Sequence, residues 1–211
     1  MGKIAIVDYG MGNLHSVKKA LEKVAPNEMV SLTRSSSVID NADRIILPGV
    51  GAFGDCIKAL RKLNLDKLIL RNSNSKPLLA ICVGMQILLE FSEESKGTQG
   101  LGIIKARVKK FVQNDQRERI KIPHMGWNSV KQSKDHFMWS GIPDNSYFYF
   151  VHSYACELID ATHGITSHGK DFSSVLACKN IFAVQFHPEK SQEYGLRIYE
   201  NFTKWSGEKL C

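Results

Sequence analysis

Several signatures of common protein classes are missing from this sequence of 211 residues. Its five cysteines are so widely spaced that no CxxC pair and no zinc-ligand spacing occurs, and their odd number does not fit a disulfide framework. No apolar run approaches the roughly 20 residues needed to cross a membrane, and the four apolar residues after Lys3 are too few for a secretory signal. We therefore expect a cytoplasmic protein with reduced, mostly buried thiols.

Internal repeats and low-complexity linkers are also missing, so we expect one domain over residues 1–211. Hydrophobic residues make up 43% of the chain and charged residues 23%, which is typical of a globular protein with a substantial core. The net charge of +7 is spread along the sequence rather than gathered in one basic stripe. This distribution argues against nucleic-acid binding and fits anionic small molecules or a protein partner better.

The two halves of the chain carry different patterns. In the first half, apolar runs predict buried strands at 4–7, 44–47 (stopped by Pro48) and 78–82, and apolar spacing predicts helices over 14–24, 55–63, 65–71 and 85–91. This alternation indicates an α/β domain with a largely parallel sheet. The second half has extended patterns typical of antiparallel strands at 103–112, 120–130, 147–156, 172–178 and 181–186, with turns at 114–115, 143–144 and 179–180. We place His163 and His168 in a glycine-rich turn and expect a last helix over 191–205.

The sharpest chemical feature is Cys82, which ends an apolar strand directly before a predicted helix. This is the pattern of a nucleophile elbow, in which a tight turn projects the nucleophile out of the sheet. The helix N-terminus would favour a thiolate, and the N–H of Val83 would face an oxyanion formed on a substrate. Gly84 suits the crowded turn, whereas Ala80 stands where glycine is more usual. The alternative is a structural cysteine buried at the end of a strand.

A nucleophilic cysteine needs a base, and His187 is the best placed of the seven histidines. It ends the strand pattern 182–186, Pro188 stiffens the following turn, and Glu189 is close enough to orient the imidazole. Cys82, His187 and Glu189 would then occupy strand ends of one sheet in the order nucleophile, base and acid.

The segment 49–54 formally matches the GxGxxG pattern of dinucleotide-binding proteins. It follows the second strand–helix unit rather than the first, Pro48 precedes it, and no acidic residue ends a later strand at a suitable distance. We prefer a loop of Gly49, Val50 and Gly51 whose backbone N–H groups complete an oxyanion hole beside the elbow.

These motifs give the chain a resemblance to the class I, or triad, glutamine amidotransferases, and among them to the glutaminase subunits of imidazole glycerol phosphate synthases. The matching segments run almost from end to end, at 7–14, 47–53, 81–86, 123–128, 149–154 and 184–191. The resemblance implies a three-layer, flavodoxin-like α/β fold with a central, mostly parallel sheet and extra antiparallel strands. Ala80 and the polar stretch 113–121 depart from the family's pattern and leave room for a specialised paralogue.

The resemblance also implies a reaction and the residues that perform it. Cys82 would attack the side-chain amide of L-glutamine, His187 would shuttle protons, and Glu189 would orient His187. The positions that match glutamine-binding residues are Gln86, Glu94, Ser153 and Tyr154, the last two through their backbone. Without the resemblance, Glu94 would be interpreted as one member of an exposed acidic pair with Glu93. No metal and no other cofactor is implied.

By the same resemblance, the ammonia passes to a separate cyclase subunit, because 211 residues cannot also hold a (β/α)8 barrel of about 250 residues. The positions that match this subunit interface are Asn13, Trp127, Tyr149 and Lys190, although Trp127 could instead be an ordinary core residue. Two alternatives stay open. One is a paralogous glutaminase that supplies ammonia for amidation in surface-polysaccharide synthesis, and the other is a nucleotide-binding module suggested by the GxGxxG match and the +7 charge.

Overall fold

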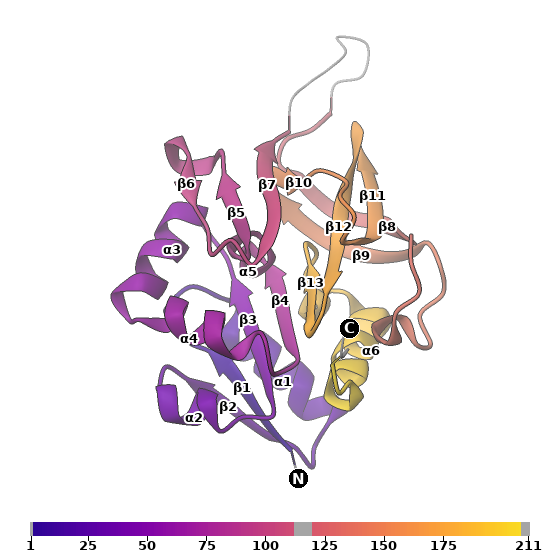
Figure 1. Ribbon diagram of the computed structural model, residues 1–211. Coiled ribbons are helices and arrows are strands. Elements are labelled where there is room, and N and C mark those ends of the chain that lie inside the picture. The colour runs from indigo at the N-terminus through magenta and orange to yellow at the C-terminus, as the bar shows by residue number, and fades with distance from the viewer. Residues whose placement is uncertain (1, 112–119, 208–211) are drawn as a thin grey trace.

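The computed structural model of the protein describes residues 2–111 and 120–207. One half of its sheet is parallel and consists, in spatial order, of β2 (Met29–Thr33), β1 (Lys3–Val7), β3 (Arg44–Gly49), β4 (Leu78–Cys82) and β13 (Ile181–Val184) (Figure 1). All of these strands except the edge strand β2 are buried along nearly their whole length. Continuous apolar runs are what a parallel strand needs when both faces of its sheet are covered.

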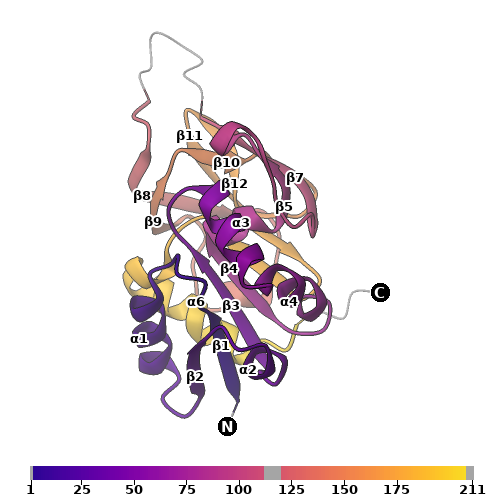
Figure 2. The same cartoon turned by 90° about the vertical axis from the view of Figure 1, so that its left-hand side faces the viewer.

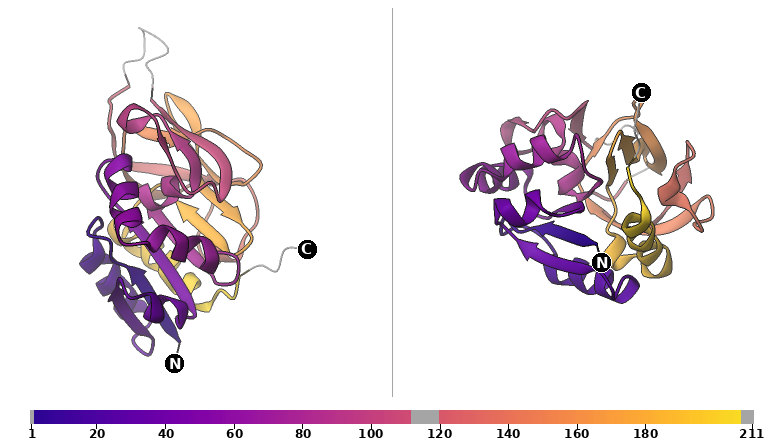
Figure 3. Two further views of the ribbon diagram at one scale, coloured as in Figure 1. Left: turned by 60° about the vertical axis from the view of Figure 1, so that its left-hand side comes forward. Right: turned by 60° about the horizontal axis from the view of Figure 1, so that its bottom comes forward.

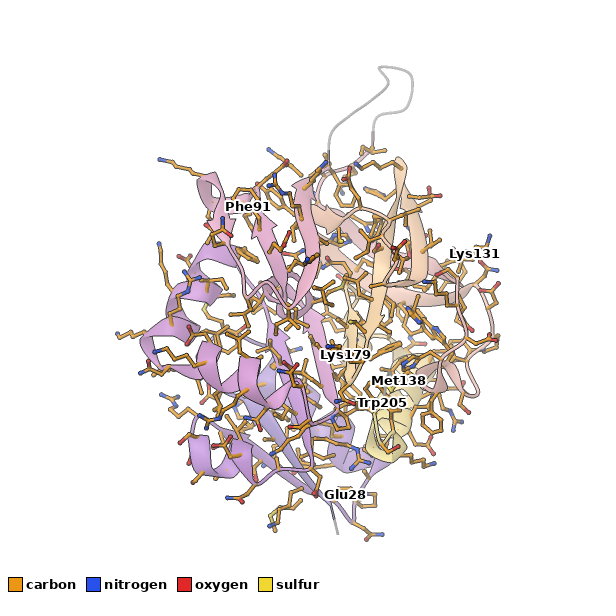
Figure 4. All side chains as sticks on the ribbon, viewed as in Figure 1. Glu28, Phe91, Lys131, Met138, Lys179 and Trp205 are labelled. Atoms are coloured by element: carbon orange, nitrogen blue, oxygen red, sulfur yellow. The ribbon has the colours of Figure 1, made fainter. Side chains whose placement is uncertain are left out.

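Helices cover both faces of the parallel half (Figure 2). One face carries α1 (Leu14–Val24) and α6 (Gln192–Lys204), and the other carries α2 (Ser36–Asp40), α3 (Phe53–Lys62) and α4 (Leu65–Asn72). Helix α6 is secured by Asn201, whose side chain donates to the carbonyl of Met138 at 2.9 Å. Met138 and Trp205 are both buried beside this helix (Figure 4). The result is the predicted three-layer α/β arrangement.

The rest of the sheet continues beyond β13 and gathers toward the end of the molecule away from the N-terminus (Figure 3). It contains β12 (Lys170–Cys178), β10 (Tyr154–Cys156), β7 (Ile104–Lys110), β5 (Leu89–Ser92) and β6 (Thr98–Gln99). A branch from β12 adds β11 (Thr162–His168), β8 (His124–Gln132) and β9 (Ser146–His152). Within this part only β5 and β7 pair in parallel among the described residues. The extra antiparallel strands are therefore confirmed, except that the strand expected among them at 181–186 is β13, which pairs in parallel with β4 on one side and antiparallel with β12 on the other.

Most predicted elements are found, and α1 and β4 have the predicted bounds. The helix expected over 85–91 is wrong in its second half, because α5 covers only Val83–Ile87 and the next residues form β5 between β6 and β7. The turn expected around His163 and His168 is also wrong, because both lie in β11, which pairs with β12 and β8.

Smaller differences concern the ends of elements. Strand β3 does not stop before Pro48 but continues through Gly49. Short 3-10 turns, which were not predicted, occur at η1 (Glu94–Lys96), η2 (Phe137–Trp139) and η3 (Pro188–Lys190). The turn expected at 114–115 lies outside the described residues. None of the helices in residues 2–111 and 120–207 has the length and apolarity needed to span a bilayer.

Candidate active site

Cys82 sits at the carboxyl end of β4, where α5 begins (Figure 1). Its backbone has φ 54° and ψ −112°, a conformation that non-glycine residues rarely adopt. Such strain persists only where the surrounding structure enforces it, and it is typical of functional turns. The side chain lines a cleft of roughly 630 Å³. The helix that follows the sulfur, α5, has only five residues, Val83–Ile87, whereas the sequence predicted a helix over 85–91.

Close backbone packing explains two glycines at this turn. Gly49, at the end of β3, lies opposite Cys82 in the sheet. A Cβ atom on Gly84 would lie 2.0 Å from the carbonyl oxygen of Leu47, and one on Gly49 would lie 2.6 Å from the backbone nitrogen of Gly84. Neither position can hold a side chain without moving backbone. This packing brings the expected oxyanion loop to the elbow, and the cleft wall here is lined by Val50, Gly51, Cys82 and Val83.

His187 and Glu189 form a hydrogen-bonded pair directly after β13. The Nδ1 atom of His187 lies 2.8 Å from Oε1 of Glu189, and the side chains are only 3% and 1% exposed. The backbone N–H of His187 donates to the carbonyl of Tyr149 at 2.9 Å, and the hydroxyl of Ser191 donates to the His187 carbonyl at 2.7 Å. The backbone of His187 is thus fixed at its N–H and its carbonyl, and the ring is held at Nδ1, while its buried Nε2 atom makes no hydrogen bond of standard geometry among the described residues.

Burial and charge oppose each other at this pair. Burial disfavours the imidazolium, but interactions with Cys82 and Glu189 outweigh burial and raise the pKa of His187. Burial likewise works against the carboxylate, yet hydrogen bonds from His187 and Asn13 hold the pKa of Glu189 below its usual value. An imidazolium next to a cysteine favours the thiolate, which is the nucleophilic form. The structure therefore brings together the three residues that the sequence singled out.

Glu189 has two further contacts. The side-chain amide of Asn13 donates to its Oε1 at 3.3 Å, and the hydroxyl of Tyr199 donates to Oε2 at 3.5 Å. Asn13, expected only at a partner interface, thus also supports the acid of the pair. Sequence reasoning missed Tyr199, because an aromatic residue on the inner face of a helix has the pattern of an ordinary core residue.

The residues expected to bind glutamine line the same cleft, namely Gln86, Glu94, Ser153 and Tyr154. Glu94 is half-buried rather than fully exposed, and its Oε2 accepts a hydrogen bond from the backbone N–H of Phe53 at 2.9 Å. Phe53 is the first residue of α3 within the GxGxxG match. A dinucleotide-binding fold holds its pyrophosphate at that helix N-terminus, so a carboxylate there argues against the nucleotide-binding alternative.

Residues 5–205 match the sequence profile of the class-I glutamine amidotransferases. The chain belongs to this family. It is 47% identical to the imidazole glycerol phosphate synthase subunit HisH of Pseudomonas syringae pv. syringae, over 98% of this chain and 99% of the relative. The subunit of the same name from Nitrosococcus oceani is also 47% identical, with the same shares covered.

Solved structures agree on the fold. PurLQS from Thermotoga maritima superposes with a TM-score of 0.69 at 16% identity, covering 97% of this amidotransferase and 99% of that chain. A further glutamine amidotransferase superposes with a TM-score of 0.69 at 17% identity, covering 95% of this chain and 97% of the other.

The residues expected at the subunit interface of this amidotransferase either line the cleft or contact a residue that does so, directly or through one neighbour. Trp127 is 46% exposed, so it is not the core residue that composition alone allowed. Its ring meets that of Tyr149 edge-on with 6.2 Å between centroids, and Nζ of Lys190 lies 5.5 Å from the Tyr149 ring centre. Lys190 and Asn13 also line the cleft. We call the surface of Asn13, Trp127, Tyr149 and Lys190 the docking face.

Sequence reasoning also missed Gln185, which is fully buried and contacts the amidotransferase's cysteine. Its Nε2 atom lies 3.6 Å from Sγ of Cys82. The available signal was a polar residue directly after the wholly buried strand β13. Over the described ranges, no group of three or more His, Cys, Asp or Glu side chains is arranged to hold a metal ion.

Proposed function

We propose that this chain is the glutaminase subunit of an imidazole glycerol phosphate synthase. It hydrolyses L-glutamine to glutamate and ammonia and delivers the ammonia to a cyclase subunit in histidine biosynthesis. The observation that carries the proposal is the meeting of Cys82 with the His187–Glu189 pair in one cleft. Near end-to-end identity of 47% to HisH subunits supports the pathway.

In the proposed mechanism, the Cys82 thiolate attacks the side-chain carbonyl carbon of glutamine and forms a tetrahedral oxyanion. His187, whose pKa is raised by Cys82 and Glu189, donates a proton to the departing nitrogen, so ammonia leaves and a thioester remains. The now neutral His187 takes a proton from water as the water attacks the thioester. Glutamate departs and Cys82 is restored as a thiolate facing the imidazolium. Glu189 holds the ring through Nδ1 in every step.

The remaining cleft residues have supporting roles in this proposal. The oxyanion is held by backbone N–H groups of Val83 and of the loop Gly49, Val50 and Gly51. Gln86, Glu94, Ser153 and Tyr154 bind the substrate, with Glu94 facing its ammonium group through the oxygen that does not cap α3.

The partner in this proposal is a separate (β/α)8-barrel cyclase that binds the docking face. Exposed aromatic and cationic side chains beside a cleft are typical anchors of a protein interface. The chain itself acts as one domain, since a single sheet joins its two halves and the family match spans residues 5–205. We expect weak glutaminase activity without the cyclase and strong stimulation by the cyclase with its nucleotide ligand.

The decisive experiment measures product formation by the complex with glutamine or with ammonium as the nitrogen source. Cys82→Ala should abolish the glutamine-dependent reaction and leave the ammonium-dependent reaction intact, because the cyclase performs the second step. Retained glutamine hydrolysis in this variant would show that Cys82 is not the nucleophile. Complementation of a histidine auxotroph separates the pathway from the polysaccharide alternative, since a glutaminase of that other pathway would not restore growth.

A further inference from the structure

Gln185 is a polar side chain buried in the core directly after the apolar strand β13. Its exposed fraction is 0%, and it follows the apolar strand β13 two residues before His187. Among the described residues its side chain has two polar contacts, with Gln86 and with Sγ of Cys82. A buried amide is expensive unless it is hydrogen-bonded, so these two contacts account for how it is tolerated.

The hydrogen-bonding chemistry of its neighbours decides which end of this amide faces the sulfur. The carbonyl of Tyr154 can only accept, so the atom of Gln86 that lies 3.1 Å from it must be the donor Nε2. The same Nε2 lies 2.9 Å from the Gln185 side chain, which must therefore present its acceptor Oε1. The other end of the Gln185 amide is then its NH₂ group, and this group faces Cys82.

A second chain of hydrogen bonds fixes the carbonyl of Tyr154 from its other side. Nδ1 of His152 lies 2.8 Å from that carbonyl and must donate to it, so Nε2 of the same ring is an acceptor. That Nε2 accepts from Nδ1 of His124 at 3.0 Å, and Nε2 of His124 accepts from the amide of Asn128 at 3.1 Å. Burial keeps both rings neutral by lowering the pKa of His152 to about 3 and of His124 to about 4.

We propose that Gln185 is a further catalytic residue, whose side-chain N–H donates to Sγ of Cys82 and stabilises its thiolate. The contact between Gln185 and Cys82 does not depend on the proposed function; only the identity of the reaction, glutamine hydrolysis, rests on it. The donor favours the thiolate before attack and again when the sulfur leaves the thioester. Gln86, Tyr154 and His152 act as positioning residues that prevent the Gln185 amide from turning its oxygen toward the sulfur.

The test is the rate of Cys82 alkylation by iodoacetamide in the full chain, without glutamine or cyclase, followed by mass spectrometry of the modified peptides. Gln185→Met keeps the volume but removes the donor, and should slow Cys82 alkylation at pH 7 about tenfold, the scale of one hydrogen bond to a charged group. Gln185→Glu keeps the shape but faces the sulfur with an anionic oxygen, so alkylation should be slower still. In both variants the pH–rate profile should move to higher pH.

Two controls separate this effect from a general disturbance. Gln132→Met changes a glutamine whose Nε2 donates to the carbonyl of Ile142 at 2.8 Å, and it should leave Cys82 alkylation unchanged. Partly exposed Cys178 is an internal reference whose rate should be the same in all variants. Should Gln185→Met unfold, exposing buried Cys56 and Cys156 to the reagent, the isosteric Gln185→Glu variant decides the question.

Cys82 alkylation within twofold of the native rate in a folded Gln185 variant would overturn the proposal. The outcome is independent of the proposed function, because alkylation requires no glutamine turnover. If the variants are slowed but the native complex does not hydrolyse glutamine, the proposed function fails and the role of Gln185 at the sulfur stands. In an active complex, Gln185→Met should lower kcat more than it changes KM, because the donor acts on the sulfur and not on the substrate.

Discussion

Replacing Glu189 by glutamine would remove the charge next to His187 while leaving the shape of the site nearly unchanged. The amide oxygen can still accept from Nδ1 of His187 at the 2.8 Å position and from Asn13. The new NH₂ group would face Tyr199, whose hydroxyl oxygen can accept in place of donating. The substitution therefore tests the charge of the carboxylate rather than the packing around it.

The size of the effect follows from the burial of the pair. A hydrogen bond to a charged group contributes about 1.5–3 kcal/mol, which corresponds to about a 10- to 150-fold change in rate. Two charges about 4 Å apart at an effective dielectric constant of about 20 interact by about 4 kcal/mol, which sets an upper bound near a thousandfold. With the side chains only 3% and 1% exposed, little solvent screens the pair. We expect kcat for glutamine hydrolysis to fall about 100-fold.

The pH dependence gives a second, independent readout. Glu189 is one of the groups that raise the pKa of His187, so removing its charge lowers that pKa. The imidazolium is then lost at a lower pH, and the alkaline limb of kcat/KM must move toward acid. The assay is steady-state glutamate production by the complex between pH 6 and 10. Glu157→Gln is the matched control, because it also replaces a carboxylate by an amide, here in exposed ion pairs with Lys109 and Lys170. Exposed ion pairs contribute little, so this variant should keep the native activity and stability. A kcat within threefold of native, with an unmoved alkaline limb, would refute the reasoning.

Three further predictions concern the fold and the docking face. Gly84→Ala places a Cβ atom 2.0 Å from a backbone carbonyl, so we expect insoluble or inactive protein, checked by expression and circular dichroism. Trp127→Ala should raise the Kd for the cyclase at least tenfold, measured by calorimetric titration. Met29→Ala is the control, because Met29 is 48% exposed on the edge strand β2, and it should leave the Kd unchanged. His124 and His152 have pKa values lowered to about 4 and about 3, so below pH 6.5 each of these two residues binds a proton in the unfolded chain that it does not bind in the folded chain. Their contribution to the free energy of unfolding should therefore fall by up to about 2.7 kcal/mol per pH unit as the pH is lowered from 6 to 5. A free energy of unfolding that stays constant over this range in urea titrations would contradict this prediction.

Sequence patterns predicted the buried strands and the amphipathic helices of the parallel half, but they missed the partly exposed edge strand β2 and the short helix α2. Leu78–Cys82 and Leu14–Val24 have the predicted bounds. The pattern failed at Leu89–Ser92, where only four residues, two of them apolar, are too few to separate a helix from a strand. Pairing with β6 and β7 decides for a strand, and these partners are distant in sequence or too short to recognise.

Strand β11 was missed for a different reason. Its polar and glycine-containing sequence has a weak apolar alternation, although Thr162, Gly164 and Thr166 are buried in the structure. Gly164 is required because a Cβ atom there would lie 2.9 Å from the side chain of Val175 on the neighbouring strand β12. A tertiary contact of this kind, at a register shift in the sheet, leaves no periodic signal in the local sequence.

The candidate site shows the same division between local and long-range information. The elbow at Cys82 and the His187–Glu189 turn are local motifs, so their residue types and spacing were sufficient to predict them. The hydrogen bonds to Glu189 from Asn13 and Tyr199 span 176 and 10 residues, and Gln185 reaches Cys82 across 103 residues. The pairing of β13 with β4 brings Gln185 to Cys82.

Single hydrogen bonds connect the docking face to His187 and Glu189, the proposed base and acid. Asn13 donates directly to Glu189, and the carbonyl of Tyr149 accepts from the backbone N–H of His187. Lys190 lies against the Tyr149 ring and follows His187 by three residues in the sequence. A partner that binds these side chains therefore acts on the groups that hold the base and its acid, without any long chain of intermediates. In the proposed complex, control of glutamine hydrolysis by the cyclase would need only a small change at this face, in line with the weak activity expected of the isolated subunit.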